Sequence, residues 1–188
     1  MPVTLRPLDS GNLSACKHLQ ISAEQRLEGL IEETPEMIEF MCEDPECVRL
    51  TIYNEDTMVG FIAYSLKEGT GGYQIERFII DQAHQRQGYG ENALRQVLEQ
   101  ISNLVGCDRV VINYMALNEG AAFLYEKIGF VVTDEFQSPE EFENEFGARY
   151  AVLLISEASK ATEKLRRKLV IDHFEAELER LKEKLDRV

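Results

Sequence analysis

The sequence has no long apolar run and no excess of positive charge, and these two absences exclude several classes of protein. No stretch approaches the roughly 18 consecutive apolar residues that a membrane-spanning helix needs. The first residues lack the basic and apolar regions of a secretion signal. Acidic residues outnumber basic ones by 34 to 20, which disfavours binding to a nucleic-acid backbone. We therefore expect neither a membrane protein nor a nucleic-acid-binding protein.

Cysteine and histidine are also scarce. Four cysteines (Cys16, Cys42, Cys47 and Cys107) are scattered along the chain. Cys42 and Cys47 lie closest together, but no further cysteine or histidine is near enough in sequence to suggest a metal site. The pattern predicts reduced, mostly buried thiols in a cytoplasmic protein that holds no metal.

The negative charge is concentrated in one part of the chain. Residues 157–188 hold nine of the 20 Lys and Arg residues and eight of the 34 Asp and Glu residues. Residues 1–156 therefore hold 11 basic and 26 acidic residues, a net charge of −15. Such a body attracts a cationic substrate and speeds its encounter, although solubility alone also explains the charge.

Hydrophobic periodicity predicts strands and helices in alternation. The order indicates an α/β domain in which helices lie on both faces of a mixed, largely antiparallel sheet. We place this domain at 1–156, with an amphipathic helix at 157–188. The predicted strands are 3–8, 47–53, 58–66, 73–81, 109–115, 130–136 and 148–155, and the predicted helices are 13–19, 34–41, 88–101 and 119–127.

The C-terminal segment carries its own pattern, typical of a long helix. Its apolar residues step by three and four, as in a heptad seam flanked by charges. Such a helix either lies along its own domain or pairs with another subunit, and the second alternative predicts a homodimer. The seam consists of Ile171, Phe174, Leu178, Leu181, Leu185 and Val188.

The most distinctive stretch, Gln85-Arg-Gln-Gly-Tyr-Gly90, lies between the predicted strand 73–81 and the predicted helix 88–101. Glycines let backbone N–H groups approach an oxygen-rich ligand with no side chain in the way. The start of a helix adds unpaired N–H donors and the positive end of the helix dipole. The stretch therefore predicts a phosphate or pyrophosphate site.

A second signature, Asn118-Glu-Gly-Ala-Ala-Phe-Leu-Tyr-Glu-Lys-Ile-Gly-Phe130, begins thirty residues after Gly88. Together the two motifs resemble the GNAT N-acetyltransferase superfamily, and the strand order fits over residues 3–155. The glycine turn is similar to that family's pyrophosphate-binding motif, and 118–130 resembles its coenzyme A-contacting helix and following strand. The resemblance implies an acetyl-CoA-dependent amine N-acetyltransferase that works by direct attack in a ternary complex.

The resemblance also implies which residues bind coenzyme A. The main chain of Phe78, Ile79 and Ile80 would pair with the pantetheine amides, which requires this strand to splay from its neighbour at 110–113, commonly through a bulge. Asn118 would hydrogen-bond the pantetheine arm, although a helix cap is an equally good explanation. The pyrophosphate would be held by Gln85, Arg86, Gln87, Gly88, Tyr89 and Gly90.

Two residues are candidates for catalysis. Tyr125 would protonate or stabilise the thiolate of coenzyme A as it leaves. Many family members place a glutamate base where this chain has Gln74, whose amide could still hold a water. Glu76, two residues on and on the same strand face, would take a proton through water, or else serve a structural ion pair.

The acceptor is the least determined part. Segment 52–90 resembles the bacterial spermine/spermidine acetyltransferases, which implies a polyamine acceptor. Glu24 and Glu28, with Gln74, would then face the cationic substrate, although the two carboxylates also suit a solvated helix face. A peptide or small-drug amine, or an acyl-CoA-binding module with little catalysis, remain alternatives.

Overall fold

The computed structural model describes residues 2–22, 25, 38, 45–104, 107–138 and 147–155. Seven strands occur in this part of the chain, together with three α-helices and two short 3₁₀ turns. The strands are β1 (Thr4–Pro7), β2 (Val48–Asn54), β3 (Thr57–Lys67), β4 (Gly72–Ile80), β5 (Arg109–Met115), β6 (Val131–Thr133) and β7 (Ala148–Leu154). The helical elements are α1 (Leu13–Lys17), η1 (Glu68–Thr70), η2 (Gln82–His84), α4 (Tyr89–Ser102) and α5 (Glu119–Ile128).

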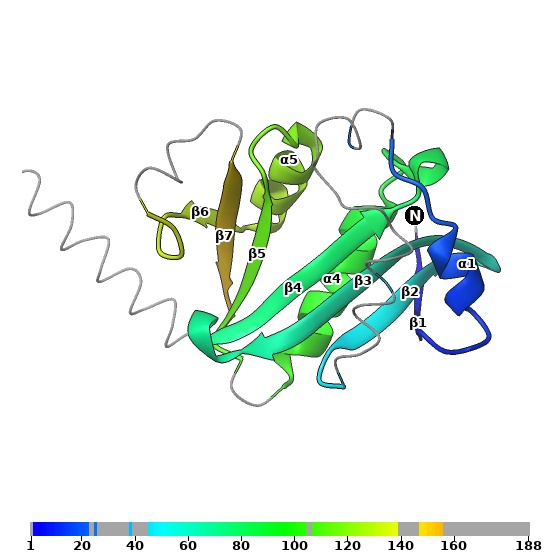
Figure 1. Ribbon diagram of the computed structural model, residues 1–188, viewed down its shortest axis with the longest axis horizontal. Coiled ribbons are helices and arrows are strands. Elements are labelled where there is room, and N and C mark those ends of the chain that lie inside the picture. The colour runs from blue at the N-terminus through cyan, green and yellow to red at the C-terminus, as the bar shows by residue number, and fades with distance from the viewer. Residues whose placement is uncertain are drawn as a thin grey trace, which may run out of the picture.

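The strands form one sheet in the order β1-β2-β3-β4-β5-β7-β6 (Figure 1). Neighbouring strands are antiparallel except β4 and β5, which run parallel. The chain crosses from β4 to β5 through α4, as a parallel connection requires. The predicted mixed, largely antiparallel sheet is therefore confirmed.

Helices cover both faces of the sheet, as predicted. The apolar stripe of α4, which includes Leu94, Val97 and Ile101, is buried against one face. On the other face, Cys16 and Leu19 pack with Phe61 and Ile79 around α1. In Figure 1, α1 lies in front of the sheet and α4 behind it. Burial on both faces makes the middle of the sheet a rigid support for the residues at its strand ends.

Several predicted boundaries need correction. The strand predicted at 130–136 spans only three residues, because the Thr133 hydroxyl accepts a hydrogen bond from the Glu135 N–H at 3.1 Å and closes a turn there. Helix α1 stops at Lys17 instead of residue 19. Of the helix predicted at 34–41, only Ile38 is described, and it is helical and buried. The long helix predicted at 157–188 lies outside the described residues.

Two further findings concern the sequence expectations on thiols and membranes. Cys16 and Cys47 are buried and Cys107 is partly buried, as predicted, whereas Cys42 lies outside the described residues. Among the helices that the structure describes, none is long and apolar enough to cross a membrane.

Candidate active site

The site is built around the place where β4 and β5 separate. The two strands pair only between Tyr73–Ile75 and Val110–Ile112. Beyond that point β4 continues along β3 to Ile80, while β5 continues along β7 to Met115. Figure 1 shows the two strands diverging towards the end of the sheet where α5 lies. The structure thus confirms the predicted splay.

A β-bulge in β4 accompanies this separation. The register between β3 and β4 passes from Ala63 opposite Arg77 to Tyr64 opposite Ile75, so Glu76 is the extra residue. A bulge bends its strand and increases the local twist. The bend at Glu76 therefore turns the rest of β4 away from β5 at the point where their pairing ends.

The main-chain groups of β4 beyond the bulge divide between two directions. The Asp81 N–H donates to the Val59 carbonyl at 2.9 Å. Because hydrogen-bonding alternates along an antiparallel strand, Ile79 also bonds to β3, whereas Phe78 and Ile80 direct their main-chain groups to the side that β5 has left. Two of the three residues predicted to pair with pantetheine thus present their backbone there, and Ile79 does not.

The loop after β4 turns through two residues with positive φ. Arg86 has φ of 60° and Gly88 has φ of 83°, and Gly88 is the N-cap of α4. Left-handed residues within a turn direct successive N–H groups to one side and form an anion-binding concavity. The first N–H groups of α4 have no partner within the helix, and the positive end of the helix dipole adds to them. The loop therefore has the backbone geometry of an anion cradle.

The side chains of the loop take different directions. Gln85 Nε2 donates to the Ile80 carbonyl at 2.9 Å and to Gln25 Oε1 at 3.1 Å. Gln87 Nε2 donates to the Ala83 carbonyl at 3.1 Å. The Tyr89 ring is buried beside His84, so only its main chain can face a ligand. Arg86 is exposed and is the cation of this loop.

The carboxylate of Glu91, in the first turn of α4, is neutralised by two cations. Lys127 Nζ lies 2.5 Å from its Oε2, and Arg95 Nη2 lies 3.1 Å from its Oε1. These hydrogen bonds, from Lys127 first and then Arg95, hold the Glu91 pKa below its ordinary value. Glu91 therefore does not leave an uncompensated negative charge at the start of the helix.

Helix α5 contacts the same region. A Cβ at Gly90 would lie 3.4 Å from an Ile80 side-chain carbon, 3.5 Å from the Phe78 ring and 3.6 Å from Leu124. At its start, the Asn118 side-chain oxygen accepts from the Ala121 N–H at 3.1 Å and caps the helix. The cap engages only the oxygen of the Asn118 amide, so its NH₂ group can still donate to a ligand.

Tyr125, on α5, is buried beside the part of β5 that has left β4. Its ring centroid lies 5.3 Å from that of Tyr114 and 5.9 Å from that of Phe130. Burial, and then the neighbouring Tyr114, raise the Tyr125 pKa above its ordinary value. The phenol therefore stays protonated through the physiological pH range, as a proton donor must.

Glu76 is the centre of a polar cluster that also contains Ser65, Lys67 and Gln74. Ser65 Oγ donates to Glu76 Oε1 at 2.7 Å, and Lys67 Nζ lies 3.0 Å from the same oxygen. Gln74 Nε2 lies 3.5 Å from Glu76 Oε2, so the two side chains share a strand face as predicted. Glu76 is thus an ion-paired carboxylate with about a fifth of its side chain exposed.

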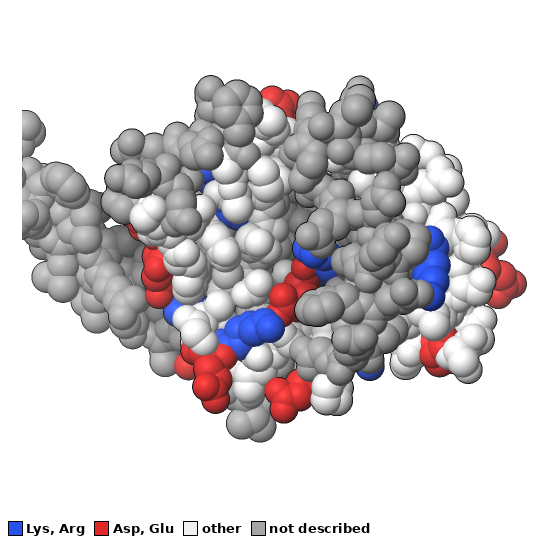
Figure 2. Space-filling view, in the orientation of Figure 1, with Lys and Arg blue, Asp and Glu red and all other residues white. Residues whose placement is uncertain are grey.

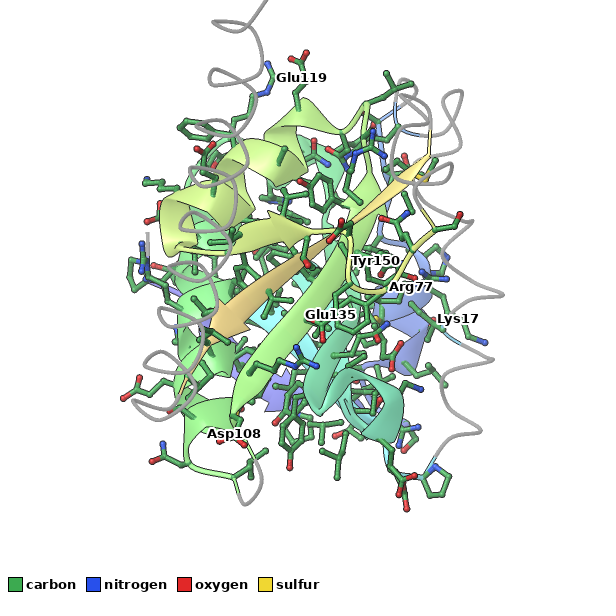
Figure 3. The ribbon with its side chains drawn as sticks, turned by 90° about the vertical axis from the view of Figure 1, so that its left-hand side faces the viewer. Lys17, Arg77, Asp108, Glu119, Glu135 and Tyr150 are labelled. Carbon is green, nitrogen blue, oxygen red and sulfur yellow. The ribbon has the colours of Figure 1, made fainter. Side chains whose placement is uncertain are left out.

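Charges of both signs lie on the face of the sheet that carries this cluster. Figure 2 shows basic and acidic side chains of the described residues next to each other there. Figure 3 shows that Arg77 of β4 and Lys17 of α1 extend to the same side of the sheet. Glu24 and Glu28, predicted to face the acceptor, lie outside the described residues, whereas Gln74 is described.

Some partners of the site were not predicted from the sequence. Ser65 and Lys67 were not predicted as partners of Glu76. Alternation along β3 places both on one strand face, and this signal would have indicated them. Lys127 lies inside the second motif, but its pairing with Glu91 joins residues far apart in the chain. Gln25 was within the acceptor segment, yet its bond to Gln85 had no sequence signal.

Known proteins share both this sequence pattern and this fold. Spermine/spermidine N(1)-acetyltransferase of Bacillus subtilis (strain 168) is 26% identical over 141 residues, covering 72% of this chain and 91% of that protein. The structure of spermidine N-acetyltransferase from Vibrio cholerae in complex with CoA and spermine has a TM-score of 0.62 at 18% identity, covering 82% of this chain and 96% of that one. A ribosomal L7/L12 alpha-N-protein acetyltransferase in complex with coenzyme A has a TM-score of 0.66 at 14% identity, covering 82% and 95%.

The family assignment rests on the sequence match. The model of the acetyltransferase (GNAT) family matches residues 16–130, more than half of the chain. This range includes the separated strands, the glycine loop and the whole of α5, and it ends at Phe130. The chain therefore belongs to the GNAT acetyltransferase family and is an acetyl-CoA-dependent N-acetyltransferase.

Proposed function

We propose that the protein transfers the acetyl group of acetyl-CoA to a primary amine, most favourably a polyamine such as spermidine or spermine. The amine attacks the thioester directly while both substrates are bound. The observation that carries this proposal is the separation of β4 from β5 beside a left-handed glycine loop and a helix start. One side offers the main-chain groups of β4 that β5 does not pair to an amide-containing chain, and the other offers N–H donors to a pyrophosphate.

The described residues suit coenzyme A in both respects. The main chain of Phe78 and Ile80 would pair with the pantetheine amides as an added strand, and the Asn118 amide would donate to the same arm. The backbone from Gln85 to Gly90 and the Arg86 guanidinium would hold the pyrophosphate.

Tyr125 is proposed as the general acid. When the amine attacks the thioester carbonyl, the C–S bond breaks and the sulfur leaves with an electron pair. The Tyr125 phenol donates its proton to that sulfur, or stabilises it by a hydrogen bond. Its raised pKa keeps the phenol protonated, which favours a hydrogen bond to the thiolate over complete transfer of the proton.

The amine must lose a proton, and Glu76 is the carboxylate that we propose accepts it, through a water. Its ion pair with Lys67 and its bond from Ser65 offer two readings. In one, the cluster orients the Glu76 carboxylate towards a water that relays the proton. In the other, the cluster only joins β3 to β4, and the acceptor enters in its neutral form. The pH dependence of kcat/KM for Glu76→Gln distinguishes these two roles.

The relatives favour a polyamine, while the charges of the site keep a second acceptor class open. The Bacillus subtilis relative is named for spermine and spermidine, and the acidic body of this chain attracts cations. However, Arg77, Lys67 and Lys17 lie on the face that carries Glu76. Such cations suit a peptide whose α-amine is accompanied by carbonyl or carboxylate groups, so an N-terminal peptide amine is the second candidate.

The test is a thiol-release assay with acetyl-CoA across matched acceptors. Spermidine and spermine represent polyamines, short peptides with free α-amines represent the second class, and aminoglycosides represent drug amines. We expect the highest kcat/KM for a polyamine, and N-acetylated product by mass spectrometry. A peptide that exceeds both polyamines would replace the acceptor assignment, and no acetyl transfer to any amine would overturn the function.

We also propose the division into a catalytic domain at 1–156 and a pairing segment at 157–188. Its support is the heptad seam in the sequence and the sheet's completion by β7 at Leu154. Sedimentation of the full chain and of a chain ending at Ser156 tests it. We expect a dimer that becomes a monomer upon truncation. The same oligomeric state for both chains would contradict a role of the segment in pairing.

A further inference from the structure

The side chain of Gln85 joins two segments that are sixty residues apart. Its Nε2 donates one hydrogen to the Ile80 carbonyl at 2.9 Å and the other to Gln25 Oε1 at 3.1 Å. An amide NH₂ has two hydrogens, so both bonds can exist at once. Gln85 is half-buried, and its side chain points back to the end of β4 instead of out of the loop. One amide nitrogen therefore touches the edge proposed for pantetheine and the segment expected to receive the acceptor.

The Gln25 end of this link is itself held in place. Gln25 N–H donates to Ser22 Oγ at 3.2 Å, and the Ser22 N–H donates to Gln25 Oε1 at 3.1 Å. This reciprocal pattern is that of a capping box. Gln25 Oε1 thus accepts from both Ser22 and Gln85. Replacing Gln85 would therefore remove one of the two hydrogen bonds that Gln25 Oε1 accepts.

A second set of bonds joins the same two segments. The Gln20 N–H donates to Asp81 Oδ2 at 2.9 Å, and the Gln82 N–H donates to the Gln20 carbonyl at 2.8 Å. The Gln82 side chain also donates to Gln20 Oε1 at 2.9 Å. Asp81 additionally caps η2 by accepting from the Ala83 N–H at 3.0 Å. Gln20 and Gln25 are thus both hydrogen-bonded to the stretch that connects β4 to the glycine loop.

We infer that Gln85 is a positioning residue that couples coenzyme A binding to the placement of Gln20, Ser22 and Gln25, where the segment expected to receive the acceptor (21–42) begins. The inference deepens the proposed function and rests on its coenzyme A site. Arg86 follows Gln85 directly and Gly88 caps α4, so a pyrophosphate held there immobilises the residue that holds Gln25. The coupling is reciprocal, because an acceptor that stabilises this position of Gln25 also favours the loop conformation that binds coenzyme A. Acetyl-CoA therefore prepares the acceptor side before the amine enters.

Hydrogen exchange with coenzyme A as the probe tests this coupling. The amides of Gln20 and Gln25 donate within the network, and a peptide covering residues 20–25 reports on them. In the parent protein, saturating coenzyme A is expected to slow their exchange about tenfold, the scale of one added hydrogen bond. In Gln85→Ala this slowing is lost, while coenzyme A still binds within about threefold of the parent affinity, because the loop backbone is retained.

Two further variants make the test specific. Gln25→Ala breaks the same bond from the other end and is expected to lose the slowing as well, which guards against a folding defect in Gln85→Ala. Gln96→Ala is the matched control, because it removes the same residue type from α4, where its bonds run to the Val3 carbonyl and the Asn92 side chain. It is expected to retain the slowing at residues 20–25. Thermal unfolding of each variant checks that it folds.

The outcomes separate this inference from the proposed function. If the parent binds coenzyme A and exchange at residues 20–25 does not change, the coupling does not exist. Retained slowing in both Gln85→Ala and Gln25→Ala would equally overturn the role of Gln85. If the parent does not bind coenzyme A, the proposed function itself fails, and this inference fails with it.

Discussion

Lys127 Nζ lies 2.5 Å from Glu91 Oε2 and joins the last turn of α5 to the first turn of α4. The contact joins the second motif, which contains Lys127, to the residue directly after the first motif. It also removes an electrostatic difficulty, because an unpaired carboxylate in the first turn of α4 would repel a pyrophosphate. The pair therefore matters for binding as well as for the packing of the two helices.

Replacing Lys127 with methionine should weaken coenzyme A binding. The variant leaves Glu91 with Arg95 as its cation, so part of the carboxylate charge acts on the pyrophosphate. A charge at a helix start changes the binding free energy enough for a loss of about twofold to fivefold. Isothermal titration with coenzyme A measures it. Glu91→Gln is the control and should bind at least as well as the parent, whereas weaker binding by that variant would contradict the charge explanation.

The titration of Glu91 should follow the same contact. Its pKa is lowered in the folded protein because Lys127 and Arg95 bond the ionised form. Its folded pKa thus lies below its unfolded one, so this contribution to stability is present above the unfolded value of 4.5 and is lost as the pH falls through the folded pKa. NMR titration of the Glu91 carboxyl should give a midpoint below 4.5, rising in Lys127→Met. An equal midpoint in both proteins would show that Lys127 does not stabilise the carboxylate.

Tyr125→Phe should lower kcat about a hundredfold, the scale at which a positioned acid contributes. Phenylalanine keeps the ring between Tyr114 and Phe130, so the affinity for coenzyme A should change little. Steady-state kinetics and titration with coenzyme A measure the two effects. Tyr114→Phe, which removes the neighbouring hydroxyl, is the matched control and should retain most of the turnover. Equal losses in both variants would assign the effect to packing.

The pH profile of Glu76→Gln should distinguish the two roles of Glu76. If the carboxylate accepts the amine proton, kcat/KM should fall at least about tenfold near neutral pH. The loss should shrink at alkaline pH, where more of the amine is already neutral. Lys67→Met, which removes the ion pair but keeps the carboxylate, should lose less. A loss that is constant across pH would indicate that Glu76 only supports the sheet.

Gly60→Ala should destabilise the protein, because a Cβ there would lie 2.4 Å from the Ile79 carbonyl oxygen, which is backbone and cannot rotate away. Forcing β3 and β4 apart should cost about 1–3 kcal/mol in the free energy of unfolding, measured by denaturant titration. It should also weaken coenzyme A binding, since β4 carries the proposed docking edge. Gly69→Ala is the matched control, because among the described residues no atom outside its two chain neighbours lies within 4 Å of its Cβ position. Equal stability of the two variants would contradict the close approach.

The local features of the fold could be predicted from the sequence. Helix α4 was expected at 88–101 and spans Tyr89–Ser102, because its apolar stripe and the glycine before it are local signals. The strand that precedes it was expected at 73–81 and spans Gly72–Ile80. Strand β6 was predicted too long, because the Thr133 hydroxyl ends it by a bond that hydrophobicity does not reveal.

The site was predictable only in outline. The glycine loop was expected from its motif, and the splay of β4 from β5, with a bulge, from the family resemblance. The position of the bulge at Glu76 was identified only by the strand register. The direction of Gln85 was not foreseen, because its partner Gln25 lies sixty residues earlier. The roles of Tyr125, Glu76, Asn118 and the loop residues stay predictions for the experiments above.

The alternation of elements, the family and the loop that suits an anion follow from the sequence alone, because each depends on residue types at short, fixed spacings. The folded chain was needed to find that Lys127 and Arg95 neutralise Glu91, that Lys67 and Ser65 hold Glu76, and that Gln85 turns inward. These arrangements join residues from different elements. They depend on the bend of β4 and on the packing of α4 against α5, which no single segment encodes.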